Sequence, residues 1–281
     1  MSASKSPERL DGTAVLCKNV RKEFYLYQHR TTSMREFFIR TIKKKPIHER
    51  KAAFMLKDLS LRMAHGEAVG LIGRNGSGKS TALRLIAGVY KPTSGVVETR
   101  GRVSAVLELG AGFSQDLTGS ENISLKGVIM GLSPDEIEAS REAILDFAEL
   151  GNFIDTPMKF YSSGMKARLA FAIAFCIKPD ILLLDEVFAV GDEAFRKKCT
   201  QHLQDFCAGG RTIILASHSV PLVRQLCTRA IWLDKGVMQR DGPVDQVLDA
   251  YHASPKPTTA NPMAPAKEPD LSKEFSRRRT P

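Results

Sequence analysis

The stretch EAVGLIGRNGSGKSTALRLIAG, residues 67–88, decides the fold of this 281-residue chain. Its first six residues are mostly apolar and run into a glycine-rich turn, and apolar residues then recur at helical spacing until Gly88. This order predicts a strand, a loop and a helix. The loop matches the pattern GxxxxGK[ST], in which backbone amides surround a phosphate, the lysine binds its oxygens and the hydroxyl ligates Mg²⁺. We therefore expect a nucleotide and Mg²⁺ to bind the segment made of Gly73, Arg74, Asn75, Gly76, Ser77, Gly78, Lys79, Ser80 and Thr81.

Composition limits the class of protein. Hydrophobic residues make up 43% of the chain, which is enough for a sizeable core. The longest uncharged run near the middle, residues 169–177, is far shorter than the roughly 20 residues of a membrane-spanning helix. Residues 1–12 are polar and lack the apolar centre of a secretory signal. We expect the protein to remain inside the cell, with its five scattered cysteines reduced and used for packing.

The net charge of +10 is concentrated in one segment. Residues 18–51 hold eleven Lys and Arg against three Glu. This composition suits contact with anionic lipid headgroups, although a nucleic-acid surface or a solvated loop would look the same. We expect an anionic membrane surface and no nucleic acid partner.

An insertion over residues 28–53 overlaps most of this basic segment. An amphipathic helix is predicted there, because apolar side chains fall on one helical face next to three consecutive lysines. We expect this helix to dock on a membrane permease or on nearby lipid; a small helix packed on the sheet is the alternative. The residues concerned are Met34, Phe37, Phe38, Ile42 and Lys43–Lys45.

Two later apolar runs, residues 181–184 and 212–216, are separated by helical sequence, which predicts neighbouring strands of a parallel sheet. Asp185 and Glu186 follow the first run, at the edge where open α/β sheets bind ligands. Asp185 is placed to hold Mg²⁺ through water, and Glu186 to polarise the water that attacks a γ-phosphate. The plain alternative is that the acidic pair only ends a strand.

Helical sequence fills about residues 118–177. Ser133-Pro134-Asp135-Glu136 combines an N-cap, a proline in the first turn and a capping-box glutamate, which predicts a helix start. The segment YSSGM, residues 161–165, opens another helix. A serine and a glycine at a helix N-terminus can bind an anion, although most such serines only cap.

The order of these motifs, with the turn at residues 189–192 and His218, resembles the ABC ATPase family over residues 13–252. The resemblance implies an α/β fold: a P-loop ATPase core with a parallel sheet, an antiparallel β subdomain and a helical subdomain at about residues 118–177. It also implies an ATPase that works as a homodimer beneath a separate integral membrane permease. Residues 253–281 are rich in proline and lysine, and we expect a disordered tail there.

The resemblance assigns roles to further residues. It implies that Ser163 and Gly164 of one subunit touch the γ-phosphate bound at Lys79 of the other. Asp192 then links the two sites across the dimer. His218 contacts the γ-phosphate beside the catalytic Glu186.

Two sites near the nucleotide remain less defined by the resemblance. The glutamine loop is shortened, so that either Ser114 or Gln115 occupies the position that senses Mg²⁺, and we favour Gln115 because its carbonyl can ligate. The adenine should stack on an aromatic ring. Phe24 aligns best with the family's stacking residue, with Tyr25 and Tyr27 as alternatives.

The signature YSSGM and the segment DEVFAVGD, residues 185–192, are similar to those of exporters of capsular polysaccharide, O-antigen and teichoic acid, as is LTGSEN, residues 117–122. This implies export of a surface polysaccharide across the bacterial inner membrane, with the glycan contacted mostly by the permease. We expect a capsule-type glycan, because too few residues follow Tyr251 for a carbohydrate-binding domain. O-antigen, teichoic acid, another lipid-linked cargo and a non-transport ABC ATPase are the alternatives.

Overall fold

In the computed structural model of the chain, which describes residues 12–28, 49–107, 112–185 and 192–254, the strands form one sheet in the order β4-β1-β2-β9-β8-β3-β7-β6-β5. Strands β3, β5, β6, β7 and β8 run parallel, whereas β1, β2 and β4 pair antiparallel. The predicted α/β class is confirmed. The strands are β1 (Thr13–Gln28), β2 (Glu49–Ala64), β3 (Ala68–Ile72), β4 (Ser94–Thr99), β5 (Val103–Val106), β6 (Ile181–Asp185), β7 (Thr212–Ala216), β8 (Arg229–Asp234) and β9 (Val237–Pro243).

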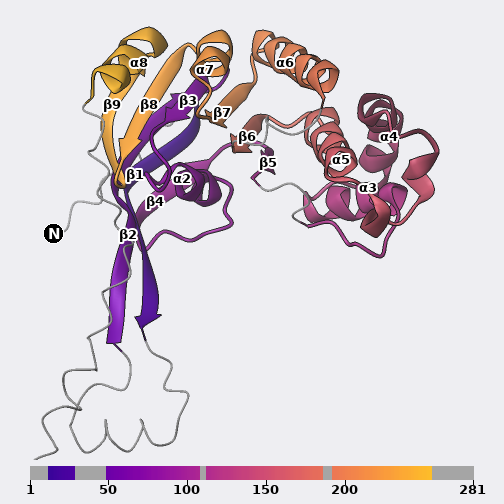
Figure 1. Cartoon of the computed structure of the whole chain (residues 1–281), viewed down its shortest axis with the longest axis horizontal. Helices are drawn as coiled ribbons and strands as arrows, with labels where there is room; N and C mark the ends of the chain where they lie inside the picture. Colours follow the sequence, from indigo (N-terminus) through magenta and orange to yellow (C-terminus); the bar gives the residue numbers. More distant parts are fainter. Residues whose placement is uncertain (1–11, 29–48, 108–111, 186–191, 255–281) are drawn as a thin grey trace, which may run out of the picture.

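Apart from α2, which packs on the sheet, the helices gather in two places (Figure 1). Helices α6, α7 and α8 lie along the side of the sheet drawn at the top, while α3, α4 and α5 form a separate helical part at the right. The described helices are α2 (Lys79–Ile86), α3 (Gly119–Ile129), α4 (Pro134–Ala148), α5 (Ser163–Cys176), α6 (Glu193–Ala208), α7 (Val220–Leu226) and α8 (Val244–Ala253), with 3₁₀ turns η1 (Gly151–Asp155) and η2 (Met158–Phe160). None of the described helices is both long and apolar enough to cross a membrane.

The central strands are covered on both faces. Every residue of β3, β6 and β7 is buried, as expected for continuous apolar runs in a parallel sheet. Alternate side chains enter different clusters: Leu182 and Leu184 pack with α5 and α6, whereas Ile181 and Leu183 pack with α2. Burial on both faces anchors these strands in the sheet, which positions the residues at their carboxyl ends, Ile72, Asp185 and Ala216.

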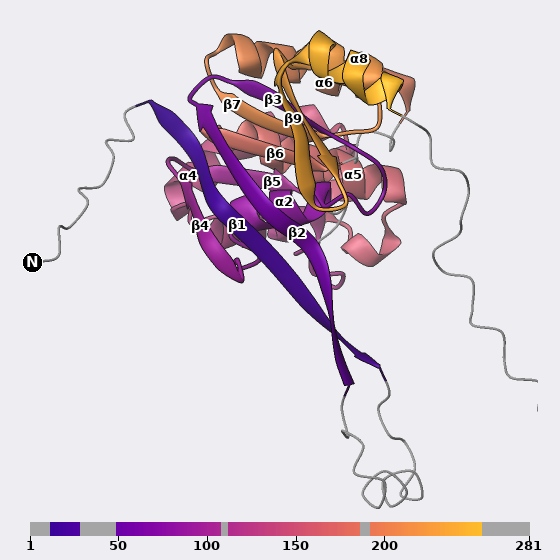
Figure 2. The same ribbon diagram turned by 90° about the vertical axis from the view of Figure 1, so that its left-hand side faces the viewer.

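Strands β1 and β2 form a long antiparallel ribbon that extends beyond the body of the molecule (Figure 2). Their pairing runs from Thr13 opposite Ala64 to Gln28 opposite Glu49. Residues 49–53 of the expected insertion 28–53 are hydrogen-bonded into β2 and extend the ribbon. The predicted amphipathic helix lies outside the described residues, as does the tail from residue 255.

The helical part begins as the sequence predicts. Thr118 and Ser133 each cap a helix, α3 and α4, and each forms a capping box with the glutamate three residues later. The five cysteines are free thiols, as expected. Burial raises the pKa of Cys17, Cys199 and Cys227 to about 12, so these thiols stay protonated and serve as packing groups.

Candidate functional site

The glycine-rich loop joins β3 to α2 in the predicted order. Gly73, Gly76 and Gly78 all have positive φ, with values of 146°, 77° and 108°. A Cβ at Gly78 would lie 2.7 Å from the carbonyl oxygen of Met55, so only glycine fits there without strain. Gly78 is also the N-cap of α2 and offers no side chain to cap it. The first-turn amides of α2 are therefore left to a ligand, which favours an anion.

Lys79 lies inside this loop. Its side chain is 4% exposed, and its ammonium donates to the carbonyl oxygens of Gly73, at 2.8 Å, and Arg74, at 3.2 Å. The loop thus surrounds a buried ammonium group, next to which a phosphate would bind. A hollow of about 330 Å³ opens in front of it, lined by Met55, Asn75, Gly76, Ser77, Gly78, Lys79, Ser80, Thr81 and Arg84.

The ends of three strands place the other predicted groups on the same edge of the sheet. Ala216 of β7 pairs with Leu71 of β3 on one side and with Asp185 of β6 on the other. Gly73 and His218 follow these paired positions by two residues. Asp185 is buried and His218 is exposed, so one carboxylate and one imidazole border the phosphate loop. Glu186 lies outside the described residues.

The aromatic residue chosen for adenine lies beside the loop but does not line its hollow. Phe24 is half-buried and meets Tyr90 edge to face, with ring centroids 5.4 Å apart. Tyr90 in turn has the guanidinium of Arg84, which lines the hollow, 5.9 Å from its ring centroid. Phe24 is therefore connected to the hollow only indirectly, by its contact with Tyr90 and the contact of Tyr90 with Arg84. The choice among Phe24, Tyr25 and Tyr27 stays a prediction.

The serine and glycine of the YSSGM segment begin α5, in the helical part of the molecule. The Ser162 hydroxyl accepts from the Met165 amide at 3.2 Å, which caps the helix. Ser163 is exposed and lies outside the lining of the phosphate-loop hollow, as does Gly164. The cap is thus Ser162, and the Ser163 hydroxyl is left facing outward at the helix tip.

Gln115 faces the YSSGM helix. Its side-chain carbonyl accepts from the ammonium of Lys166 on α5 at 3.0 Å, and its backbone carbonyl accepts from the Lys159 amide at 2.9 Å. The fully buried amide of Asn122 holds the same segment, accepting from the Ser114 amide at 2.8 Å and donating to three carbonyls of residues 114–118. This arrangement places Gln115 with α5 rather than with Lys79 and Ser80, so the proposed Mg²⁺ role of Gln115 requires a rearrangement.

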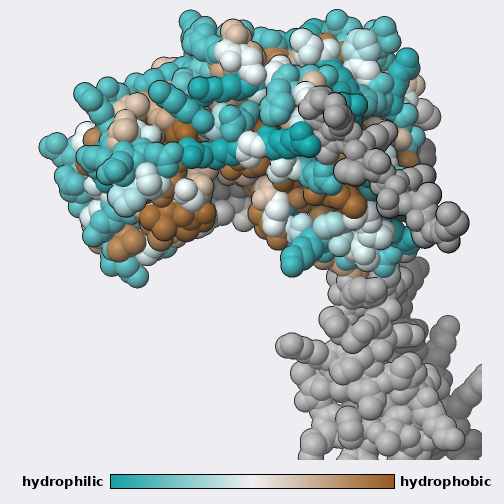
Figure 3. Space-filling view, turned by 180° about the vertical axis from the view of Figure 1, so that it is seen from behind, coloured by the Kyte–Doolittle hydropathy of each residue, from teal (hydrophilic) through white to brown (hydrophobic). Residues whose placement is uncertain are grey.

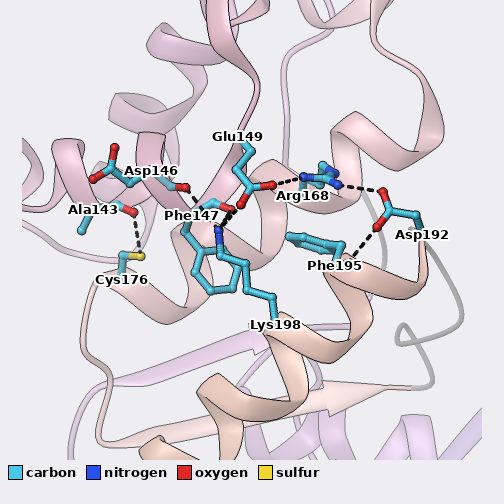
Figure 4. Close-up of polar contacts among 9 residues, drawn as sticks. All are labelled: Ala143, Asp146, Phe147, Glu149, Arg168, Cys176, Asp192, Phe195 and Lys198. Carbon is cyan, nitrogen blue, oxygen red and sulfur yellow. Dashed lines mark hydrogen bonds and ion pairs between the residues drawn. The ribbon is translucent and has the colours of Figure 1, made fainter.

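Asp192 connects α5 to α6 (Figure 4). One carboxylate oxygen caps α6 by accepting from the Phe195 amide at 2.8 Å, and the other pairs with Arg168 of α5 at 2.7 Å. Arg168 also pairs with Glu149 at 2.8 Å, and Glu149 accepts from Lys198 of α6. Hydrogen bonds from the Phe195 amide and from Arg168 lower the pKa of Asp192, and those from Lys198 and Arg168 lower the pKa of Glu149.

Comparisons with known proteins decide the family. The sequence profile described as "ABC transporter" matches residues 56–189. Two Klebsiella pneumoniae proteins named "O-antigen export system ATP-binding protein RfbB" are 43% and 42% identical over 233 residues, which is 83% of this chain and 95% of each relative. The chain belongs to the ATP-binding subunits of ABC transporters.

Other relatives agree with this assignment. A Myxococcus xanthus protein of the same name is 43% identical over 248 residues, and this chain spans 56% of its length. Among solved structures, a dimeric ATP-binding cassette, MJ0796 bound to ADP and phosphate, superposes with a TM-score of 0.65 at 25% identity, covering 82% of this chain and 98% of that one. As an ABC subunit the chain is an ATPase, and its hydrolysis of ATP is coupled to transport.

The residues present suit the Mg²⁺–nucleotide that this family uses. The Ser77 hydroxyl is buried with no hydrogen-bond partner among the described residues, which leaves it for a ligand or water. Ser80 and Asp185 offer the hydroxyl and carboxylate oxygens that Mg²⁺ prefers, in a number typical of sites where phosphate and water complete the coordination. When bound, Mg²⁺ would neutralise part of the charge on the triphosphate.

Several residues of the ABC site were not found from the sequence. Met55 and Arg84 line the phosphate hollow, Lys166 binds Gln115, and Arg168 binds Asp192. Lys166 and Arg168 could have been found from the sequence, because their spacing after Ser163 places them in the first two turns of the same helix. Met55 carries no such signal, because its contact with the loop depends on how β2 meets Gly78.

Proposed function

We propose that this ABC subunit hydrolyses ATP to drive export of an O-antigen type of polysaccharide through a separate membrane permease. The observation that carries the proposal is 42–43% identity, over 95% of their length, to two Klebsiella proteins named as ATP-binding proteins of an O-antigen export system. The match spans nearly the whole length of these relatives, whose names give O-antigen as their cargo. O-antigen therefore replaces the expected capsule-type glycan as the first candidate.

The proposed working unit is a homodimer with two shared ATP sites. Two observations support it: the hollow around Lys79 contains no residue of the signature segment, and Ser163 is exposed at the tip of α5. A dimeric cassette is also among the solved relatives. In this proposal Lys79 and Ser80 hold the β- and γ-phosphates, and Ser163 and Gly164 of the second copy contact the γ-phosphate from the other side.

The proposed chemistry within each site is an attack by water on the γ-phosphate. Glu186 positions the water and accepts its proton, and His218 contacts the γ-phosphate oxygens at the end of β7. Asp185 orients the Mg²⁺ ligands. Because Ser163 and Asp192 are tied to the same α5 through its first two turns, closing the dimer would bring both to the nucleotide together.

A hollow between the core and the helical part supports docking of a permease. It has a volume of about 210 Å³ and is lined mainly by apolar side chains. Figure 3 shows apolar surface on the helical part and on the core. Among the exposed apolar side chains, Val89 lines the hollow and Val128 and Ile129 belong to α3 of the helical part. Exposed apolar side chains around a cleft are typical of a protein interface. A short helix of the permease is the proposed occupant.

Deletion of the gene tests the proposal. The deletion strain should lose the O-antigen ladder of its lipopolysaccharide and keep its capsule. A plasmid with the wild-type gene should restore the ladder, whereas a Lys79→Ala copy, expressed at the same level, should not. Loss of capsule with an intact ladder would replace O-antigen by capsule as the cargo.

A further inference from the structure

A second hollow meets the phosphate loop at Arg74. It has a volume of about 230 Å³ and lies where α8 packs against β8 and β9, at the top left of Figure 1. This volume is below the roughly 300–1,000 Å³ of pockets for drug-sized ligands, so a smaller ligand fits. The lining residues are Arg74, Trp232, Asp234, Gln239, Tyr251 and Ser254.

Polar groups line this hollow without partners of their own. Across the described ranges, the Arg74 guanidinium, the Asp234 carboxylate, the Trp232 indole N–H and the Tyr251 hydroxyl form no hydrogen bond or ion pair. Some charged residues nearby are paired, such as Arg229 with Asp241 at 2.6 Å. Others, such as Arg240, are exposed to solvent. Four half-buried polar groups of different chemistry, unpaired among the described residues, surround one hollow and indicate a ligand site.

The two aromatic rings form a corner rather than a slot. The ring centroids of Trp232 and Tyr251 are 5.6 Å apart, and their planes meet at 73°. A flat nucleobase binds best between parallel faces, which this corner does not offer. A saturated ring with C–H groups on its face and hydroxyls around its rim suits the corner, since its C–H face can rest on one aromatic ring.

The polar groups complement such hydroxyls. A sugar hydroxyl both donates and accepts, and the hollow offers donors on Arg74 and Trp232, an acceptor on Asp234, and both on Gln239 and Tyr251. We propose that this hollow binds a single pyranose ring. This inference rests on the proposed function in one respect: the exported glycan is the natural source of the ring, with a free cytoplasmic sugar as the second source.

The site is joined to the ATP site through Arg74. The Arg74 carbonyl accepts from the Lys79 ammonium at 3.2 Å and from the Ser77 amide at 3.1 Å. A sugar that holds the Arg74 guanidinium therefore also restrains the backbone that supports Lys79. By thermodynamic linkage, sugar binding and ATP binding alter each other by the same factor. A glycan bound in the hollow would thus change the affinity of the subunit for ATP.

Tryptophan fluorescence tests this directly, because Trp232 is the only tryptophan of the chain. The purified full chain, without nucleotide, is titrated with methyl pyranosides of galactose, glucose and mannose and with short oligosaccharides of each. We expect a saturable spectral shift at millimolar concentration for at least one pyranoside. Sorbitol, an open-chain polyol, and adenosine should give none. Tighter binding of the oligosaccharide identifies a glycan end as the source, and equal binding identifies a free sugar.

Substitutions in the hollow test whether the sugar binds there. Asp234→Ala should weaken the sugar affinity at least tenfold, and Gln239→Ala, an exposed position, serves as a second variant if the first fails to fold. Asp249→Ala, exposed on the same α8, should bind as the wild type does. The proposal is overturned by the absence of any saturable shift, by an equal response to adenosine or sorbitol, or by unchanged affinity in both variants. Since this titration uses neither ATP nor permease, its failure leaves the O-antigen proposal standing.

Discussion

Replacing Arg168 by methionine should destabilise the protein by separating α5 from α6 and from the end of α4. Arg168 pairs with Asp192 at 2.7 Å and Glu149 at 2.8 Å, and its guanidinium lies 4.7 Å from the ring centroid of Phe195. Exposed ion pairs contribute about 0.2–1 kcal/mol each, and the two carboxylate side chains are 59% and 53% exposed. Adding about 0.5 kcal/mol for the ring contact gives a loss of roughly 1–2.5 kcal/mol.

Equilibrium unfolding in urea measures this loss, and thermal unfolding should show a midpoint lower by about 2–10 °C. Arg196→Met, which removes an exposed arginine of α6 that makes no side-chain ion pair within the described part of the chain, is the control and should change the midpoint little. Both variants retain an unbranched side chain of good helix propensity, so differences reflect the lost contacts.

A double-mutant cycle isolates the Arg168–Asp192 pair. Asp192→Asn keeps the N-cap of α6, because asparagine caps as well as aspartate does, and removes only the charge. The cycle should give a favourable coupling energy that 1 M salt reduces. Strict additivity of the two single variants, at low salt, would refute the network as a link between α5 and α6.

Three further predictions concern the site, pH and cysteines. Lys79→Ala should lower ATP hydrolysis more than a hundredfold, because no other ammonium of the loop is buried. Phosphate release measures the rate, and Lys91→Ala, at an exposed position, is the control. Near-normal turnover by Lys79→Ala would disprove the assigned site. Folding lowers the pKa values of Asp192 and Glu149, so their contribution to the free energy of unfolding is complete above the unfolded pKa values of about 3.9 and 4.3 and is lost as pH falls through the lower folded values. The difference in stability between wild type and Arg168→Met should therefore be constant from pH 7 to 5 and should shrink at lower pH. A difference that grows at low pH would contradict this. With a pKa raised to about 12 and buried sulfur atoms, Cys17 and Cys227 should resist iodoacetamide at pH 8 until urea is added, as mass spectrometry of the alkylated peptides will show.

Local signals in the sequence predicted the parts of the fold that depend on neighbouring residues. The strand, loop and helix around Lys79 follow from glycine chemistry and apolar spacing, and Ser133 starts α4 through a capping box that is complete within four residues. The buried strands β6 and β7 are continuous apolar runs, which need no long-range information to be recognised. These elements were predicted to within a residue or two at their ends.

Contacts between distant segments escaped prediction. β5 has only four residues of mixed burial, and its place at the sheet edge depends on pairing with β6, some 78 residues later. The length of the β1–β2 ribbon follows from cross-strand pairing that composition alone does not reveal, so part of the ribbon was assigned to the insertion. The contact of Gln115 with Lys166, 51 residues away, likewise depends on how the helical part folds back on itself.

The central claim is that each ATP lies between Lys79 of one copy and Ser163 of the other. Its most direct test is the structure of the Glu186→Gln variant with ATP and Mg²⁺, since this variant should bind ATP and remain closed. The account predicts that the Ser163 hydroxyl lies within hydrogen-bond distance, about 2.7–3.2 Å, of a γ-phosphate oxygen of the ATP held by the partner's Lys79. A structure in which ATP fills the phosphate loop while Ser163 of both copies lies far from every γ-phosphate would contradict it.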